Sequence, residues 1–414
     1  MMTPRVIIGG DANQQLIDFC REQCYQHLIL VADQNTFAAA GQRVNAELTG
    51  AGFDIQNIVL DGAVVPDEST LLRVLIQANV ADSAFLAVGA GTINDITRFV
   101  SFKTGRPFIS IPTAPSVDGF TSSVAALVIG GVKLTTPAKP PQAVFANSQV
   151  LVNAPQPMIS AGFGDLLGKS TSLADWKLGH LLWNEKYDAA IAARTANLLE
   201  RCVPLAAAIG RRETQAVCEL MDALAESGNC ILDFGSSHPA SGSEHHLSHF
   251  LELKLLREKR PAILHGLKVG LSALTIARMY ENLSDISKPQ AEALLDASTL
   301  PQIEAERSKI KLAYPGIADE IINSQQAFLN LAGSDFNQLK RRILENWDEI
   351  QEIAAGVIPS QQIAGLLSSA GAATQPVGLG LGDDEVQAAA RYAHYLRPRF
   401  TICKLMKIFY PERF

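Results

Sequence analysis

Short apolar runs alternate with helix-like stretches through the first third of the chain, and this alternation constrains the fold more than any other feature. The runs are Val6–Ile8, His27–Val31, Phe53–Val59, Phe85–Val88 and Phe108–Ile111. Nearly uninterrupted apolar strands that alternate with helices are typical of a parallel sheet covered on both faces. The sequence therefore predicts an α/β domain built on such a sheet at the N-terminal end.

The pattern changes at about Ala154, after which apolar residues recur at helical spacing and strand signals are scarce. The segment Asn153–Pro157 holds two prolines and is a plausible boundary. A length of 414 residues suits two domains rather than one core. We expect residues 1–154 to form the α/β domain and residues 155–414 to form an all-helical domain.

Composition and charge exclude several classes of function. Hydrophobic residues make up 47% of the chain and charged residues 19%, which indicates a globular protein. The net charge of −7 and the lack of a dense Lys/Arg tract argue against a nucleic-acid partner. No stretch approaches the roughly 18 apolar residues of a membrane span, and no signal-peptide core is seen at the N-terminus. The six cysteines form no CxxC pair, so a reducing cytoplasm is expected.

Two loops follow predicted strands and could hold a dinucleotide. The glycine-rich turn Gly89–Asp95 connects a strand to a helix, where backbone N–H groups and the helix dipole suit a diphosphate. A plain turn explains the same residues about as well. The segment Thr113–Ser122 follows another strand at the sheet edge where ligands bind in open α/β folds. Its two prolines and its polar side chains also fit a rigid polar loop without a ligand.

Three further segments suggest a metal site. Asp165 lies in an apolar, glycine-rich setting, where a buried carboxylate needs a cation or a metal, although an N-cap aspartate is the alternative. His245 and His249 are four residues apart and would share one helix face, while His246 would point elsewhere. His265 follows one helix and a turn later, and it would complete an Asp-His-His set with an open coordination position.

In this order the segments resemble those of the glycerol-1-phosphate dehydrogenases, and the chain length resembles their bacterial branch. That family belongs to the superfamily of glycerol dehydrogenases, iron-type alcohol dehydrogenases and dehydroquinate synthases. Gly89–Asp95 looks like the GGGTxxD loop, Thr113–Ser122 looks like TAPSxDGxxS, and Ala161–Lys169 looks like AGFGDLLGK. Ser241–His249 looks like SGSEHxxSH, and His265 with Gly266 looks like the second metal histidine. The resemblance implies a dehydroquinate synthase-like fold. In that fold, residues 1–154 would form a Rossmann-like dinucleotide-binding domain, residues 155–414 would form a helical metal- and substrate-binding domain, and the active site would lie in the cleft between them.

The resemblance also implies a reaction and a role for each site residue. The expected reaction is reduction of dihydroxyacetone phosphate to sn-glycerol 1-phosphate with NAD or NADP, aided by one divalent metal ion, zinc or nickel, in a homodimer. The metal ligands would be Asp165, His245 and His265. Asp118 and His249 would contact the substrate, and Asp165 would join them. The cofactor would contact Gly91, Thr92, Ile93, Asn94, Asp95, Thr113, Ala114, Pro115, Ser116 and Ser122.

Three positions bear on the details of the expected site. Ala90 replaces the middle glycine of the first loop, which is tolerable unless that residue needs a positive φ. Val117 stands where a histidine or polar residue is expected, but it removes no ligand. Asp33 follows the second strand, where a carboxylate could bond the ribose hydroxyls of NAD and repel the extra phosphate of NADP. A strand-end turn residue is the alternative reading of Asp33.

Other functions remain open at this stage. A glycerol or polyol dehydrogenase of the same superfamily is the nearest alternative, but such enzymes look more like AAHAIHNG where this chain has Ser241–His249. A dehydroquinate synthase-like lyase would need more basic residues around its acidic substrate. A non-catalytic binding protein that kept the fold would have little reason to retain all three of the expected metal ligands.

Overall fold

The computed structural model describes residues 3–413 of the chain. These residues pack as two compact units, each with its own internal contacts. We call the first the sheet unit and the second the helical unit. The sheet unit comprises Met1–Leu166, Glu200–Ser236 and Ser369–Ala372, and the helical unit comprises Leu167–Leu199, Ser237–Ser368 and Ala373–Phe414. The sheet unit is thus larger than the stretch 1–154 that we expect to bind the dinucleotide, and that functional division stays a prediction.

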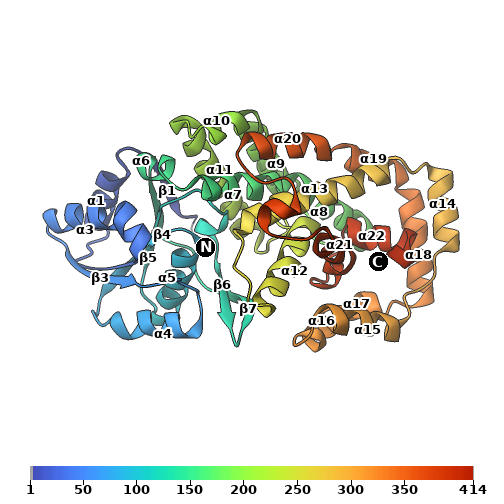
Figure 1. Cartoon of the computed structure of the whole chain (residues 1–414), viewed down its shortest axis with the longest axis horizontal. Coiled ribbons are helices and arrows are strands. Elements are labelled where there is room, and N and C mark those ends of the chain that lie inside the picture. Colours follow the sequence, from blue (N-terminus) through green and yellow to red (C-terminus); the bar gives the residue numbers. More distant parts are fainter. Residues whose placement is uncertain (1–2, 414) are drawn as a thin grey trace. The chain divides into compact units, whose positions relative to one another are not determined.

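A six-stranded parallel sheet forms the centre of the sheet unit, with the strand order β1-β8-β5-β4-β2-β3 (Figure 1). In chain order the strands are β1 (Arg5–Gly9), β2 (His27–Asp33), β3 (Asp54–Leu60), β4 (Ser83–Gly89), β5 (Phe108–Pro112) and β8 (Ala143–Asn147). The register places Phe85 opposite Phe108 and Val31 opposite Ala87. The predicted parallel sheet is confirmed.

Both faces of the sheet are buried, because alternate residues of a strand point to opposite sides. Leu28 and Leu30 of β2 join a core with α1 and α3, whereas Ile29 and Val31 join a core with α4 and α5. Every residue of β4 is buried, as the uninterrupted apolar run predicts. The helices and turns of the sheet unit are α1 (Ala12–Glu22), α2 (Gln34–Thr36), η1 (Phe37–Gly41), α3 (Gln42–Gly50), α4 (Glu68–Gln77), α5 (Gly91–Thr104), η2 (Gly119–Thr121), α6 (Ser148–Val152), α7 (Gln156–Leu167), η3 (Val203–Leu205), α10 (Ala206–Gly210) and α11 (Thr214–Phe234).

A two-stranded antiparallel hairpin also belongs to the sheet unit and was not expected from the sequence. It consists of β6 (Val124–Ile129) and β7 (Val132–Pro137), with Ile129 opposite Val132. Gly130 and Gly131 form the turn with φ of 60° and 76°, the left-handed backbone that two-residue hairpin turns require. β8 was not expected either, although it is buried along its whole length.

The helical unit contains no strand among its described residues, which confirms the predicted helical C-terminal region. α9 (Ala189–Cys202) runs from this unit into the residues of the sheet unit. The other elements are α8 (Lys169–Trp183), α12 (Ser243–Arg257), α13 (His265–Ser284), α14 (Lys288–Ala297), α15 (Ile303–Ala313), α16 (Ala318–Ser324), α17 (Gln326–Leu329), α18 (Gly333–Glu345), α19 (Trp347–Ala355), α20 (Ser360–Ser369), η4 (Pro376–Leu379), α21 (Asp383–Tyr392), η5 (Ala393–Tyr395), α22 (Ile402–Phe409) and η6 (Pro411–Arg413).

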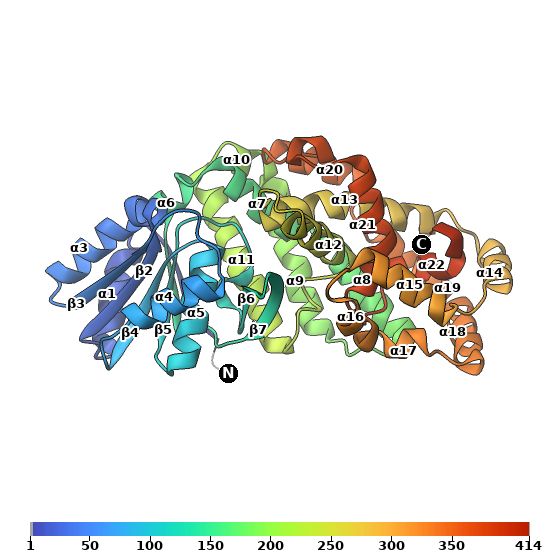
Figure 2. The same ribbon diagram turned by 60° about the horizontal axis from the view of Figure 1, so that its bottom comes forward.

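The packing of α12 against α13 determines where the histidine-bearing segments lie (Figure 2). Leu247, Leu251 and Leu255 recur every four residues along α12 and are buried. Val269 and Ala273 bury the facing side of α13. Because each helix begins at its histidine segment, this apolar contact fixes the start of both helices within one unit. No helix in the described part of the chain is long and apolar enough to cross a membrane.

Candidate active site

The glycine-rich turn lies between β4 and α5, as the sequence predicts. β4 ends at Gly89 and α5 begins at Gly91. A Cβ atom on Gly89 would lie 2.6 Å from Cβ of Ile93, so only glycine allows the helix to turn back so closely over the strand. Ala90 has a φ of −90°, and its methyl group therefore causes no backbone strain. The first turn of α5 carries N–H groups with no acceptor inside the helix, as an anion site requires.

The end of this segment is held by buried polar contacts. The Ser110 hydroxyl of β5 donates to Asn94 Oδ1 at 2.8 Å. Arg98 Nη1 donates to Asp95 Oδ1 at 2.7 Å and to the Val124 carbonyl at 2.8 Å, and the Arg98 side chain is buried. Burial raises the pKa of Asp95 to about 6, although Arg98 lowers it in part. Asn94 and Asp95 therefore fix α5 against the sheet and the loops, while Gly91 and Thr92 remain at the surface.

The second predicted cofactor loop, Thr113–Ser122, lies against the first. The Thr113 N–H donates to the Gly89 carbonyl at 3.2 Å. A Cβ atom on Gly91 would lie 3.3 Å from Val117 Cγ2. The polar and small residues of the loop are buried, namely Thr113, Ala114, Ser116 and Ser122. The structure therefore brings together two loops that lie more than ten residues apart in the sequence, at the carboxyl ends of neighbouring strands β4 and β5.

Asp118 and Asp165 meet within the sheet unit. The Asp118 backbone N–H donates to Asp165 Oδ2 at 3.1 Å, and the Ser227 hydroxyl of α11 donates to Asp118 Oδ2 at 3.0 Å. Asp165 lies fully buried in the last turn of α7. Asp165 therefore does not cap the N-terminus of a helix, and the N-cap alternative is wrong. A buried carboxylate at a helix C-terminus opposes the helix dipole and needs other stabilisation, which an N–H donor or a cation can provide.

Two residues of α11 that the sequence did not single out also shape this loop. Ser227 holds the Asp118 carboxylate, and the Thr121 hydroxyl donates to the Ala225 carbonyl at 2.8 Å. A Cβ atom on Gly228 would lie 2.1 Å from Thr121 Oγ1 and 2.5 Å from the Asp118 carbonyl. The residues around Ser227 and Gly228 in the sequence do not indicate this role. Both lie inside the long helix α11, and their importance comes only from their contacts with the folded loop Thr113–Ser122.

Asp33 has a structural partner in the folded chain. Its Oδ1 accepts from the Thr36 N–H at 2.8 Å, and the Asp33 N–H donates to Thr36 Oγ1 at 3.0 Å. These two bonds form a capping box at the start of α2. The cap uses one of the two carboxylate oxygens, so the alternative reading of Asp33 as a strand-end residue describes part of its role.

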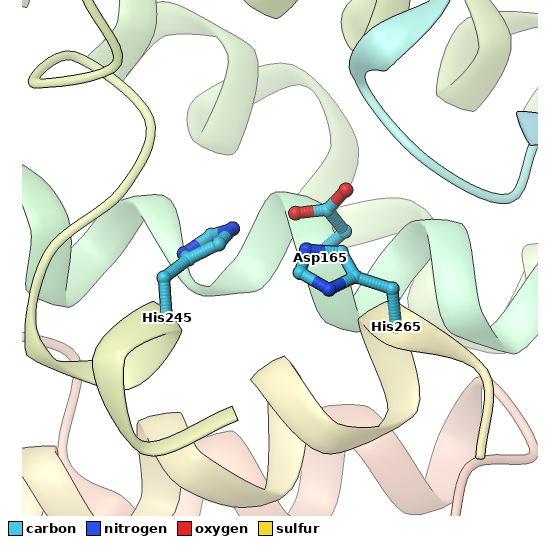
Figure 3. Close-up of side chains that lie close together, drawn as sticks. All are labelled: Asp165, His245 and His265. Atoms are coloured by element: carbon cyan, nitrogen blue, oxygen red, sulfur yellow. The ribbon is translucent and has the colours of Figure 1, made fainter. Parts of the chain in front are cut away.

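Three histidine rings gather in the helical unit, where His245 and His249 lie in the first two turns of α12 and His265 begins α13. The ring centroids of His245 and His265 are 5.2 Å apart, those of His249 and His265 are 5.5 Å apart, and those of His245 and His249 are 6.2 Å apart. Ligand atoms of His245 and His265 lie within 4.8 Å of each other. Figure 3 shows both side chains with Asp165, which is the third member of this candidate ligand group. A second candidate group joins His249 and His265 with Glu252.

The neighbours of these histidines are charged or buried. His249 Nδ1 lies 3.4 Å from Glu252 Oε2, and Glu252 Oε1 lies 3.5 Å from Lys268 Nζ. Burial lowers the pKa of His246 far below its ordinary value, and nearby arginine and lysine charges add to this, so His246 is neutral. His246 belongs to neither candidate ligand group of the described residues.

Glu244, which the sequence reasoning left out, is fully buried beside His245. Its Oε1 lies 2.7 Å from His245 Nδ1, and its Oε2 accepts from the Thr171 hydroxyl at 2.7 Å. Burial raises the pKa of Glu244, but the contacts with His245, Thr171 and the Gly242 N–H outweigh this and hold the pKa below its ordinary value. Glu244 is therefore ionised. The only feature of the sequence that could have indicated its importance is its position directly before His245.

Known proteins were compared with the chain. Residues 7–155 match the family described as iron-containing alcohol dehydrogenase. The fold is similar to that of maleylacetate reductase from Rhizobium sp. (TM-score 0.62, 14% identity, 100% of this chain and 97% of that one). It is similarly close to an iron-containing alcohol dehydrogenase from Corynebacterium glutamicum (TM-score 0.63, 14% identity, 99% and 95%).

Curated relatives match the chain along nearly its full length. The chain is 37% identical over 400 residues to glycerol-1-phosphate dehydrogenase (NAD(P)+) of Bacillus velezensis, covering 96% of this chain and 89% of that protein. It is 39% identical over 399 residues to the protein of that name from Halalkalibacterium halodurans, covering 95% and 90%. An archaeal protein of that name, from Pyrococcus furiosus, is 33% identical over 285 residues, covering 68% and 80%. The chain therefore belongs to the glycerol-1-phosphate dehydrogenase family, within the iron-type alcohol dehydrogenase superfamily.

Proposed function

We propose that the protein catalyses the reversible, NAD(P)H-dependent reduction of dihydroxyacetone phosphate to sn-glycerol 1-phosphate. The observation that carries this proposal is the near full-length similarity to curated glycerol-1-phosphate dehydrogenases at 37–39% identity. Two features of the structure support the proposal. Two adjoining loops at the ends of β4 and β5 would bind the cofactor, and three histidine rings on α12 and α13 would serve the metal ion and the substrate.

The cofactor would bind at the carboxyl ends of β4 and β5. The N–H groups of Gly91, Thr92 and Ile93 begin α5 and would hold the diphosphate, as helix N-termini do. Thr113–Ser116 and Ser122 would contact the rest of the dinucleotide, and Asn94 and Asp95 would fix the helix behind it. Supporting this, the Thr113 N–H already binds the Gly89 carbonyl, so both loops are held in one position before any ligand arrives.

Asp165, His245 and His265 would hold one divalent cation, zinc or nickel. One carboxylate and two imidazoles form a ligand set that suits either ion, and three protein ligands leave a position open for substrate. The fit is supported by the full burial of the Asp165 carboxylate and by the close approach of the two histidines. When bound, the ion supplies Lewis-acid polarisation of a ketone oxygen and the nicotinamide supplies the hydride.

The chain's own groups would orient the substrate and move its proton. The Asp118 carboxylate, held by Ser227, would accept a hydrogen bond from a substrate hydroxyl. His249 contacts Glu252 and lies near the rings of His245 and His265, where its imidazole would contact the substrate or pass a proton to the new hydroxyl. Both side chains approach from fixed elements, which limits the orientations that the ketone can adopt.

The decisive experiment compares two ketones in the direction of NADH oxidation with metal-reloaded protein. We expect chelator-sensitive turnover with dihydroxyacetone phosphate and little with dihydroxyacetone, because the family's named substrate carries a phosphate. Turnover with the unphosphorylated ketone alone would identify a polyol dehydrogenase instead. Silence with both ketones would contradict the proposal and favour a lyase or a binding protein.

We further propose NAD preference, with Asp33 as its cause. The Asp33 cap on α2 uses Oδ1 only, so Oδ2 would accept from a ribose hydroxyl and repel a phosphate at the same place. The ratio of kcat/KM for NADH to that for NADPH checks this, and Asp33→Asn should lower the ratio. A clear preference of the unchanged protein for NADPH would contradict the assignment.

We also propose that the enzyme works in the cytoplasm. None of the six cysteines is joined in a disulfide within the described residues, which fits a reducing compartment. Fractionation of cells that produce the full chain should recover the dehydrogenase activity with cytoplasmic marker enzymes. Activity that stays with the membrane or periplasmic fraction would contradict this proposal.

A further inference from the structure

We propose that Glu244 is a positioning residue that holds the His245 imidazole by Nδ1 and so presents Nε2 to the metal ion. The inference rests on the proposed function, because it takes His245 as a metal ligand. It concerns only residues of the helical unit, and it assigns a role to a carboxylate that the ligand set does not include.

Three contacts fix the Glu244 carboxylate. Oε1 accepts from the Gly242 N–H at 2.7 Å and lies 2.7 Å from His245 Nδ1. Oε2 accepts from the Thr171 hydroxyl of α8 at 2.7 Å. The side chain is fully buried, so water does not compete for these bonds. These contacts hold the carboxylate in one orientation. Because the His245 ring binds to it through Nδ1, the orientation of the ring is fixed as well.

The contact between Glu244 and His245 is unusual for neighbours in a helix, since side chains at i and i+1 do not normally face each other. It is allowed here because Gly242 is the N-cap of α12, and Glu244 and His245 are the second and third helical residues. Glu244 folds back over the first turn and binds the N-cap N–H. A Cβ atom on Gly242 would lie 2.7 Å from Asp175 Oδ2 and 3.0 Å from Glu244 Oε2, so only glycine leaves room for this arrangement.

The chemical consequence follows from the two ring nitrogens of histidine. A carboxylate that accepts from Nδ1–H selects the tautomer whose lone pair is on Nε2, and it increases the electron density of that lone pair. It also prevents rotation of the ring about Cβ–Cγ. Partners of this kind commonly change metal affinity by about 10–100-fold when they are removed. Glu244 would thus affect metal binding without touching the ion.

The test measures metal affinity of the full-length protein with Zn²⁺ and a competing fluorescent chelator, and separately the visible spectrum of the Co²⁺-substituted protein. Glu244→Ala removes the contact and should weaken Zn²⁺ binding by about 10–100-fold. Glu244→Gln keeps an acceptor for Nδ1–H, and its amide can donate to Thr171, whose hydroxyl can still donate to the Gly168 carbonyl at 3.0 Å. This variant loses only the charge and should show a smaller loss of affinity.

A matched control separates metal positioning from general loss of a buried charge. Glu306 is a buried carboxylate of the same unit, which binds Lys407 at 2.7 Å and makes no contact with the histidines. Glu306→Gln should lower thermal stability but leave the Zn²⁺ affinity and the Co²⁺ spectrum unchanged. NADH affinity should be the same in all three variants.

The outcomes distinguish this inference from the proposed function. If His245→Ala weakens Zn²⁺ binding but folded Glu244→Ala and Glu244→Gln bind as tightly as the unchanged protein, the positioning role is wrong and the ligand assignment stands. If Glu244→Ala fails to fold, the Zn²⁺ affinity and the Co²⁺ spectrum of Glu244→Gln test the positioning role by themselves. A change in them supports the role, and values equal to those of the unchanged protein contradict it. If His245→Ala itself binds Zn²⁺ normally, the proposed metal site is wrong.

Discussion

At the scale of single residues, glycines allow the loop Thr113–Ser122 to contact two helices. A Cβ atom on Gly162 of α7 would lie 1.8 Å from the Pro115 carbonyl oxygen, and one on Gly228 of α11 would lie 2.1 Å from Thr121 Oγ1. Both distances are far below van der Waals contact, and the atoms that would be hit are backbone or buried groups. The loop can therefore occupy its position only because residues 162 and 228 are glycines.

Replacing Gly228 by alanine should destabilise the protein and weaken NADH binding. Alanine normally stabilises a helix interior by about 1 kcal/mol relative to glycine. A decrease in the free energy of unfolding would therefore be caused by the steric clash. We expect a net loss of about 1–3 kcal/mol, as for overpacked cores, together with a higher Kd for NADH in a fluorescence titration. Gly365→Ala in α20 is the control, because nothing lies within 4 Å of its added methyl, and it should be neutral or stabilising. Equal stability of both variants would contradict the prediction.

Replacing His265 by alanine should remove the metal but not the fold. His265 is the first residue of α13, where a side chain contributes little to the helical core. We expect metal content after dialysis to fall to near zero and turnover to fall by at least about 10³-fold, because a missing Lewis acid costs several kcal/mol in the transition state. Circular dichroism should be unchanged. Near-normal activity with normal metal content would refute the assignment of His265.

At the scale of whole elements, α22 shows how charges can be buried in a core. Every residue of this helix is buried, including Lys404 and Lys407. Lys407 binds Glu306 at 2.7 Å, whereas Lys404 Nζ donates to Gln325 Oε1 at 3.0 Å and lies 5.0 Å from the centre of the Phe328 ring. Burial lowers the pKa of Lys404 to about 7 from 10.5.

This lysine should make the stability of the protein rise with pH. Between about pH 7 and pH 10.5 the unfolded chain keeps the Lys404 proton and the folded chain does not, so stability increases by up to about 1.4 kcal/mol per pH unit from this group. Lys404→Met should therefore be more stable than the unchanged protein near pH 6 and should lose that advantage toward pH 10. Melting temperatures across this range test the prediction. A difference that does not change with pH would contradict it.

The elements that could be predicted from the sequence are those whose own residues carry a clear hydrophobic pattern. β2, β4 and β5 are defined by their own apolar runs, and α12 and α13 by their periodicity. β8 is as short as β5 and carries an apolar run of its own, but it was overlooked; in the fold it pairs with both β1 and β5. The cofactor loops could be predicted because their residues are contiguous. Ser227, Gly228 and Thr171 could not, because they act on residues distant in the sequence.

At the scale of the whole molecule, α4 offers a surface for the homodimer that we expect from the family. Leu72, Leu75 and Ile76 are exposed by 55%, 44% and 68%, and their spacing puts them on one face of the helix. Phe102 on α5, which packs against α4, is exposed by 39%. Apolar side chains grouped in this way usually mark a protein interface. We propose that a second copy of the chain covers this face.

Placing a charge on α4 should dissociate the dimer. Ile76→Glu puts a carboxylate on the apolar face at its most exposed position on α4, where pairing would have to desolvate it. Light scattering coupled to size-exclusion chromatography should give about twice the chain mass for the unchanged protein and about once for the variant. Leu312→Glu alters an equally exposed side chain on α15 and should leave the mass unchanged. A variant that keeps the full dimer mass would exclude α4 from the interface.

The double use of Glu244 has an evolutionary consequence. One carboxylate oxygen closes the first turn of α12 and also holds a histidine ring, so natural selection for a durable protein and selection for metal capture act on the same atom. A substitution of Glu244 would therefore be opposed by both kinds of selection. A protein engineer who wishes to change the preferred ion should therefore keep Glu244 and vary the side chains around it.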